Sequence, residues 1–286
     1  MRNSLITALI FFISCSAIAG WDEAQIAVKK GDYPTAVREY TVLADKGDAR
    51  AQLILGALYN KGGAVPRDDK AAASWFQKAA QQGSTEAQYW LGKLYEDSQL
   101  PQDYSQAANW YQKAAQQGLA KAQVRLGHLY SRGLGVSLNY NEAILWYGKA
   151  ALQGDADAEH ALGLMYMLGK GLPKNQQVAN GWLTKAAAQN HADSQLLLGG
   201  VYEEGNSTDR RPVLAYALYE MAITNKTSMA KEAIKKRDTL AKKLSAQQLD
   251  NSKKLVAELS KPQNFSKAIA AYLEKSDQLF RFFPKN

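Results

Sequence analysis

Apolar residues recur along most of the chain at the spacing of one helix face. In residues 51–59 they occupy positions 51, 55, 58 and 59, and in residues 71–80 they occupy positions 72, 75, 76, 79 and 80. Both sets follow the period of an amphipathic helix. Gly83 follows the second set, where a left-handed residue commonly ends a helix. The pattern therefore predicts two helices joined by a loop.

This pair of patterns returns at a nearly constant interval. A glycine that follows leucine and precedes tyrosine by three residues recurs at spacings of 36, 35, 36 and 36 residues. These glycines are Gly56, Gly92, Gly127, Gly163 and Gly199. A period of this size indicates a solenoid of stacked helix pairs. Because glycine inside a helix costs about 1 kcal/mol relative to alanine, we expect the paired helices to approach closely at these positions.

The full repeat pattern is A-x-x-x-L-G-x-x-Y-x-x-G-x-G-V-x-x-[DN]-x-x-x-A-x-x-W-x-x-K-A-A-x-x-G, and residues 122–154 match it best. It resembles the Sel1-like repeat family, which is tetratricopeptide-like. The resemblance implies an all-α, right-handed α-solenoid of stacked antiparallel helix pairs with a helical C-terminal cap. The second copy departs from the pattern at Ser98 and Leu100, and the fifth has Leu218 in place of tryptophan.

Four regions follow from these patterns. Residues 1–19 resemble a signal peptide, residues 20–47 a tetratricopeptide-like helix pair, residues 48–225 five Sel1-like repeats, and residues 226–286 a basic helical cap. Within the cap, Ser245 and Gln248 are spaced as a capping box, and Pro262 interrupts the helical pattern.

The first residues predict export. A basic start and a nine-residue apolar run precede Ala17-Ile18-Ala19, the small-residue pattern of a signal-peptidase site. Cleavage after Ala19 would leave a mature chain without cysteine, which suits the oxidising periplasm. The alternative is a lipoprotein anchored through Cys15, because residues 12–15 loosely resemble a lipobox.

Positive charge is concentrated at one end of the chain. The 286 residues carry a net charge of +8, and residues 226–286 contain fourteen Lys or Arg against six Asp or Glu. A solvated helix face is one explanation. The other is a surface that contacts an acidic protein or an anionic membrane. Nucleic acid is not an expected partner of an exported protein.

Residue chemistry gives no indication of catalysis. His128, His160 and His191 fall in three repeats and three helical phases, so we expect no shared metal site. Sequence motifs for nucleophilic serine, phosphate loops and dinucleotide binding are missing. The chain is therefore interpreted as a non-enzyme that needs no cofactor.

Positions that vary between repeats are the candidates for partner binding. Four such residues are Tyr89, Trp90, Arg125 and His160. Trp90 either contributes to an interface or fills a local gap, because its equivalents include both apolar residues and Arg125. The tryptophans at 75, 110, 146 and 182 could stack on sugar or peptide ligands, but their phase with the repeat alanines favours packing between helices.

These features predict an exported scaffold or adaptor that binds a partner protein on the solenoid surface. The resemblance implies partners such as an envelope complex, a signalling protein, or a secreted effector that the chain would neutralise as an immunity protein. The alternative is a carbohydrate-binding accessory factor or hydrolase of the cell envelope.

Overall fold

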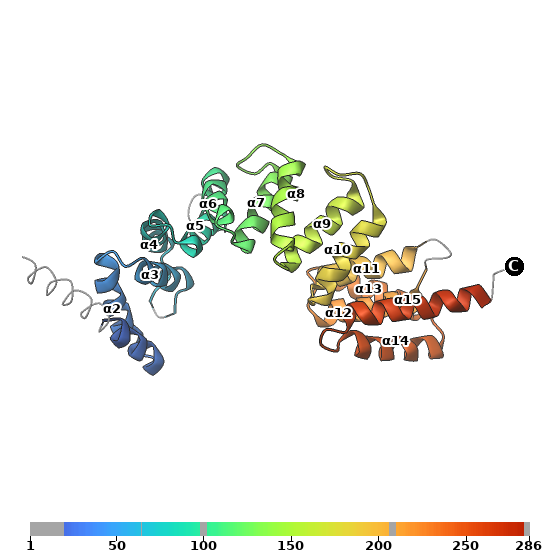
Figure 1. Ribbon diagram of the computed structural model, residues 1–286. Helices are drawn as coiled ribbons and strands as arrows, with labels where there is room; N and C mark the ends of the chain where they lie inside the picture. The colour runs from blue at the N-terminus through green and yellow to red at the C-terminus, as the bar shows by residue number, and fades with distance from the viewer. Residues whose placement is uncertain (1–19, 64, 98–101, 206–209, 283–286) are drawn as a thin grey trace, which may run out of the picture. The chain divides into compact units, whose positions relative to one another are not determined.

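The computed structural model describes residues 20–63, 65–97, 102–205 and 210–282, with side chains through Lys275. Every regular element in these ranges is a helix (Figure 1). The chain divides into two compact units, Met1–Ala143 and Ile144–Asn286. The predicted signal peptide and its cleavage site after Ala19 lie outside the described residues.

The first unit is a succession of helices that each pack on the next. Residues 20–30 are helical and precede α2. The helices that follow are α2 (Tyr33–Asp45), α3 (Ala49–Lys61), α4 (Asp69–Gln81), α5 (Thr85–Asp97), α6 (Tyr104–Gln116) and α7 (Ala120–Arg132). Aspartates cap several N-termini; Asp68, for example, accepts hydrogen bonds from the backbone N–H groups of Lys70 and Ala71.

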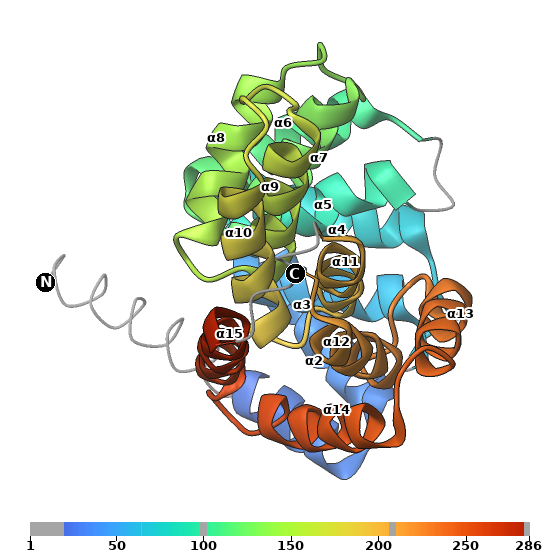
Figure 2. The same cartoon turned by 90° about the vertical axis from the view of Figure 1, so that its right-hand side faces the viewer.

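The second unit begins within α8 and ends with the cap. Its helices are α8 (Tyr140–Ala151), α9 (Ala156–Leu168), α10 (Gln176–Ala188), α11 (Ala192–Glu204), α12 (Pro212–Thr224), α13 (Ala230–Ala241), α14 (Ala246–Leu259) and α15 (Phe265–Phe282). Both α13 and α14 pack on α12, whereas α15 packs on α14 and α10 (Figure 2). The capping box predicted at Ser245 is confirmed at the start of α14.

Close helix approach explains the glycines inside the repeat helices. A Cβ added to Gly92 would lie 2.8 Å from the ring of Tyr111. A Cβ added to Gly56 would lie 2.5 Å from Phe76. Gly163 and Gly199 meet Leu183 and Tyr219 in the same way. The predicted close packing is thus confirmed at these four positions.

Buried amides join consecutive repeats. Gln88 donates from Nε2 to the carbonyl oxygen of Ala80 in the last turn of α4, at 3.2 Å, and accepts from Gln117 Nε2 at 2.8 Å. The Ala80 carbonyl also accepts from the backbone N–H of Gly83 at 3.1 Å, so the Gln88 amide adds a second donor at the end of α4. Equivalent bonds to a last-turn carbonyl are made by Gln52, Gln123 and Gln195.

Two repeats contain a glutamate, buried at Glu96 and half-buried at Glu203, that accepts a hydrogen bond from a tyrosine. Tyr111 donates its hydroxyl proton to Glu96 at 2.6 Å, and Tyr219 donates to Glu203 at 2.7 Å. Burial and the neighbouring carboxylate raise the pKa of both tyrosines. Both repeats have inter-helix loops that depart from the pattern.

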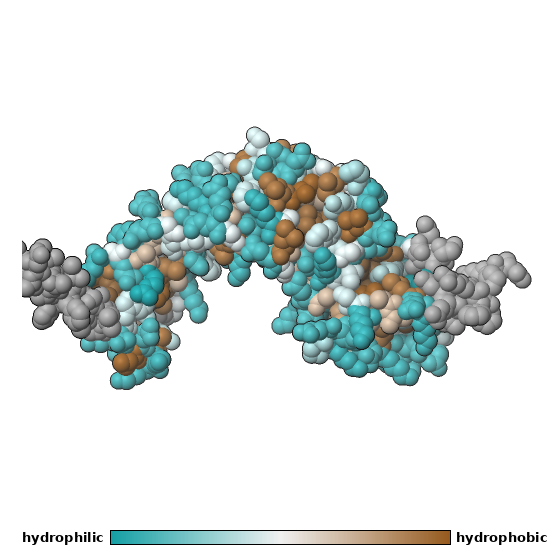
Figure 3. All heavy atoms as spheres, in the orientation of Figure 1, coloured by the Kyte–Doolittle hydropathy of each residue, from teal (hydrophilic) through white to brown (hydrophobic). Residues whose placement is uncertain are grey.

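The outward-facing side of α8 is more apolar than the equivalent side of α4. The α4 positions hold Ser74, Gln77 and Gln81, all exposed. In the second unit the corresponding residues are Leu145, Gly148 and Leu152. Leu145 is 48% exposed and Leu152, just after α8, is 85% exposed. Figure 3 shows hydrophobic atoms gathered over α8.

Candidate binding groove

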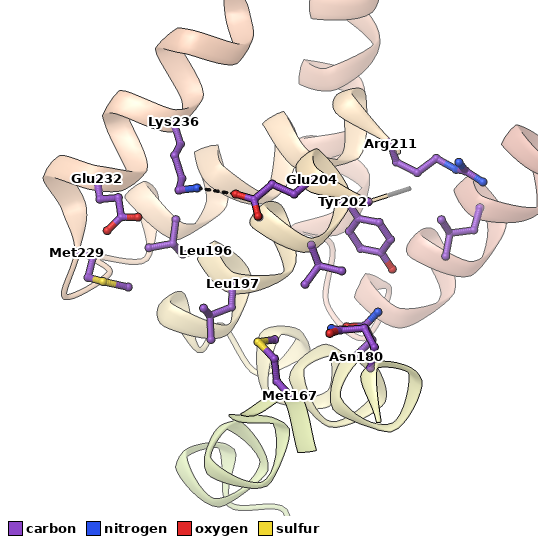
Figure 4. A pocket seen from close by; sticks show the side chains of 15 residues that line it. Met167, Asn180, Leu196, Leu197, Tyr202, Glu204, Arg211, Met229, Glu232 and Lys236 are labelled. Carbon is purple, nitrogen blue, oxygen red and sulfur yellow. Dashed lines mark hydrogen bonds and ion pairs between the residues drawn. The ribbon is translucent and has the colours of Figure 1, made fainter. Parts of the chain in front are cut away.

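A groove opens beside α11 in the second unit (Figure 4). Its volume is about 710 Å³. One helical face of α11 supplies the floor, with Leu197, Gly200 and Val201. The walls come from α9, α10, α13 with the residue before it, and α15, through Met167, Asn180, Met229, Glu232, Lys236 and Leu273. Helices of two repeats and the cap therefore build a single groove.

Two adjacent glycines in α11 have opposite environments. A Cβ added to Gly199 would lie 2.5 Å from the Tyr219 ring, so no side chain fits there. A Cβ added to Gly200 would meet only the Tyr219 hydroxyl, at 4.0 Å. Gly200 thus has ordinary helical backbone and open space in front of it. Helix packing explains Gly199, but it does not explain Gly200.

Hydrogen bonds that Asp193 accepts fix the turn before α13 on one side of the groove. This residue of α11 accepts from the backbone N–H of Ser228 at 2.9 Å and from its hydroxyl at 2.8 Å, and it also accepts from Thr227. Burial raises the pKa of Asp193, but these hydrogen bonds outweigh it and hold the pKa below its usual value. Met229 follows directly, so its position on the rim is set by these bonds.

The α13 side of the groove carries more negative than positive charge. Lys236 forms an ion pair with Glu204 at 3.5 Å, and Glu204 is 75% exposed. Glu232 lies one turn before Lys236 and has no hydrogen bond or ion pair with any residue that the structure describes. Figure 4 shows both α13 side chains on the side of that helix that faces α11. Lys236 pairs with Glu204, so the Glu232 carboxylate has no cationic partner among the described residues.

The opposite end of the groove is closed by a buried arginine. Arg211 is 6% exposed and donates from Nη1 to the Arg210 carbonyl at 3.2 Å. Tyr202 lies beside it, and burial raises the pKa of that tyrosine while Arg211 partly offsets the rise. The arginine is therefore part of the packed wall.

Three of the four residues predicted to bind a partner lie together in the first unit. Trp90 is half-buried and stacks on Phe76, with ring centroids 6.4 Å apart. Tyr89 packs against both Trp90 and Tyr111, at 5.5 and 5.8 Å. Arg125 forms an ion pair with the buried Glu96 at 3.5 Å and keeps 37% of its side chain exposed.

A small hollow adjoins this aromatic cluster. It has a volume of about 180 Å³ and is lined by Trp90 together with Asn60, Arg67, Lys93, Leu94 and Asp97. Arg67 is paired with Asp69 at 2.9 Å, and the Lys93 ammonium lies 5.2 Å from the Trp90 ring. The cluster is therefore mainly occupied by contacts within the chain.

His160, the fourth predicted residue, contacts His191 in the second unit. Their ring centroids are 4.4 Å apart, and Ser194 Oγ lies 2.8 Å from His160 Nδ1 and 3.0 Å from His191 Nδ1. The different repeats and helical phases of these histidines gave no indication of this contact, which forms because the N-cap of α11 packs onto α9 of the preceding repeat. Burial and the neighbouring His191 lower the pKa of His160 to about 4.

The same contacts place a serine, a histidine and an aspartate in a row. His191 Nε2 lies 3.4 Å from Asp157, but Ser194 is fully buried. The backbone N–H of Ser194 also donates to His191 Nδ1 at 3.2 Å, as at a helix N-cap. A nucleophile must be accessible to its substrate, and the buried Ser194 is not. The arrangement is therefore interpreted as an N-cap of α11.

The repeat tryptophans are covered by lysines. Lys78, Lys113, Lys149 and Lys185 place their ammonium groups 3.9 to 4.3 Å from the ring centroids of the tryptophans three residues earlier. Such a contact occupies one ring face. Trp146 is 5% exposed, and the other three are half-buried. These environments favour packing over ligand stacking.

The described residues hold neither a candidate metal site nor a helix suited to cross a membrane. Residues 20–63, 65–97, 102–205 and 210–282 contain no group of three His, Cys, Asp or Glu side chains that could hold a metal ion. Within the same ranges, no helix combines the length and the apolar character needed to cross a membrane.

Comparison with known families identifies the repeats. The Sel1 repeat model matches five consecutive segments, residues 49–84, 85–119, 120–155, 156–191 and 192–226. The chain belongs to the Sel1 repeat family. Its fold is accordingly an all-α solenoid of stacked Sel1 helix pairs. A search of curated proteins gave no match.

Solved structures of other Sel1 repeat proteins are similar. A Sel1 repeat protein from Oxalobacter formigenes is 30% identical with a TM-score of 0.65, over 76% of this chain and 88% of that one. The protective antigen c5321 of uropathogenic Escherichia coli is 27% identical with a TM-score of 0.52. That match covers 93% of this chain but only 64% of the antigen. Immunity protein Pa5087 of Pseudomonas aeruginosa, at 22% identity and a TM-score of 0.44, is too distant to inform function.

The groove residues were not predicted from the sequence, although one signal was present. The position that follows the packed Sel1 glycine holds Ala57, Lys93, His128 and Leu164 in the first four repeats, but Gly200 in the fifth. A second helical glycine without a packing role marks a place where another molecule can come close to the backbone. The walls could not be located in this way, because the cap has no repeat pattern.

Proposed function

We propose that this Sel1 repeat protein is an exported scaffold that binds a segment of a partner protein in the groove beside α11. Sel1 repeats are typical of protein-interaction scaffolds, and stacked helix pairs provide extended binding surfaces. The groove combines an apolar floor with polar groups on its walls, which is the usual composition of a binding site. Binding is proposed in preference to catalysis.

Gly200 carries this proposal. A glycine in the interior of a helix costs about 0.5–1 kcal/mol relative to alanine. Gly200 has room for a side chain, so packing gives no compensation for that cost. A partner segment that lies against α11 would need this space. Met167 of α9 and Met229 before α13 line two different walls, and methionine adapts readily to the shape of a bound segment.

Export rests on the first nineteen residues. The proposed location is the periplasm after cleavage beyond Ala19, with lipid attachment at Cys15 as the alternative. Intact-mass measurement of the protein from its native envelope separates these states, because acyl chains on Cys15 would add their own mass. An envelope complex, a signalling protein or a secreted effector would each be accessible there as the partner.

The binding proposal is tested by affinity capture from envelope extract with three baits. The native chain, Gly200→Leu and Gly148→Leu are compared, because Gly148 is also helical with open space around it but lies outside the groove. We expect Gly200→Leu to lose a partner that Gly148→Leu retains, with both variants as thermally stable as the native chain. Equal capture by all three baits would place binding elsewhere.

A further inference from the structure

The groove has one apolar side and one acidic side. Leu197, Met167 and Leu273 come from α11, α9 and α15, whereas Glu204 and Glu232 come from α11 and α13. Gly200 lies in the floor, and a side chain could enter the open space in front of it. A segment that fills the groove must therefore present an apolar side chain near a group that can pair with carboxylates.

The acidic side is a local exception in a basic region. Residues 226–286 contain fourteen Lys or Arg against six Asp or Glu. Among the described residues that line the groove, the cations are Lys236, whose ammonium is 3.5 Å from Glu204, and Arg211, which is 6% exposed at the opposite end. Glu232 has no ion pair among the described residues. On the α13 side, an incoming ammonium or guanidinium group would meet an uncompensated carboxylate, whereas an incoming carboxylate would meet a lysine that is already paired.

We propose that the groove selects a polypeptide segment with a bulky apolar side chain close to a lysine or arginine. This inference rests on the proposed function. The apolar side chain lies over Gly200 between Met229 and Leu273. The basic side chain pairs with Glu232 on α13. Burial of the apolar side chain supplies most of the affinity, and the charge pair supplies the choice between partners.

Selection of peptides tests this specificity. A phage library of random 12-residue peptides is selected on the mature chain, on Gly200→Leu and on Glu232→Lys. We expect the native chain to enrich peptides with a large apolar residue and Lys or Arg within three positions. Gly200→Leu should abolish the enrichment. Glu232→Lys should replace Lys and Arg with Asp and Glu at the enriched basic position.

A charge-swap cycle then measures the pair directly. For one selected peptide, we expect Glu232→Lys to weaken binding at least ten-fold. Changing the basic residue of the peptide to glutamate should restore binding to the variant and weaken binding to the native chain. Glu274→Lys is the matched control, because this exposed carboxylate makes the same charge change on α15 outside the groove lining. It should leave the dissociation constant within two-fold.

The outcomes separate the inference from the function on which it rests. Enrichment that Gly200→Leu abolishes, but without a preference for basic residues, would overturn the inference and leave the groove as a binding site. Enrichment of the same peptides by the native chain and Gly200→Leu would overturn both. Dimerisation of the native chain that Gly200→Leu removes would identify a second copy as the occupant and would also overturn the inference.

Discussion

Helical glycines differ between the two units. In the first unit, Gly56 and Gly92 lie against aromatic rings of the paired helix. The second unit has packed glycines of the same kind at Gly163 and Gly199. It also has three, Gly148, Gly181 and Gly200, that face open space. Each open glycine costs about 0.5–1 kcal/mol of helix stability without a packing contact in return.

The difference shows where the sequence departs from what the fold requires. Trp90 and Arg125 in the first unit are held by Phe76 and Glu96, so the variation there is absorbed by internal contacts. In the second unit, Gly200 forms part of a groove of about 710 Å³. The second unit is therefore the better place to look for a partner.

Exchange of the packed glycine should have the largest effect on stability. Gly199→Leu would force side-chain atoms into the Tyr219 ring, because even a Cβ there would lie 2.5 Å from it. We expect the free energy of unfolding to fall by about 3 kcal/mol. Urea denaturation followed by circular dichroism measures it, with Gly200→Leu as the neighbouring control. Equal stability of the two variants would remove the distinction between packed and open glycines.

Acid should destabilise the second unit through His160. Its pKa is about 4 in the folded chain, against about 6.5 in an unfolded chain. Stability is complete above pH 6.5 and falls as the pH drops toward 4, because only the unfolded state gains the proton in that range. The loss should reach about 3 kcal/mol at pH 4.

The control for this titration is His160→Gln, since an amide can keep the hydrogen bond to Ser194. Denaturation midpoints of both proteins between pH 7 and 4 give the difference. The native chain should lose more stability than the variant over this interval. Parallel curves would mean that His160 titrates in the same way in the folded and unfolded states.

Charge reversal at Arg125 tests whether the first-unit cluster belongs to the fold. Arg125→Glu would bring a carboxylate next to Glu96, which is 6% exposed. Because Arg125 is partly exposed, we expect a loss of about 1–2 kcal/mol. Arg132→Glu, at an exposed position of the same helix, should change stability little. An unchanged melting temperature with lost partner binding would instead assign Arg125 to an interface.

The smallest expected effect is an increase in stability. Gly200→Ala adds a methyl group whose carbon would lie 4.0 Å from the nearest atom, the Tyr219 hydroxyl oxygen. It should stabilise the chain by about 0.5–1 kcal/mol through helix propensity. Thermal melting at neutral pH measures the shift. A lower melting temperature would show that the open space at this position is needed by the fold.

Periodicity was sufficient to predict the repeats and the close packing of their glycines. The position of Gly92 opposite Tyr111 follows from a period that repeats along the chain. The contact between His160 and His191 was missed, since it depends on how the N-cap of one repeat meets a helix of the previous one.

The groove could not be predicted for a different reason. Its walls include Met229, Glu232 and Leu273 from the cap. These residues have no equivalent in the repeats, so no spacing relates them to α11. Met229 is positioned by hydrogen bonds that Thr227 and Ser228 donate to Asp193. These bonds depend on the turn after the last repeat. Only Gly200, which has equivalents in the other repeats, gave a signal that sequence reasoning could have used.

Photo-crosslinking from the two units tests the central claim most directly. A benzoylphenylalanine residue is placed at Glu204, on the rim of the groove, or at Arg67, on the rim of the hollow beside Trp90. After irradiation in envelope extract, adducts are measured by mass spectrometry. We predict a partner adduct from position 204 that the additional substitution Gly200→Leu removes, and none from position 67. The same adduct from position 67 alone would contradict the account.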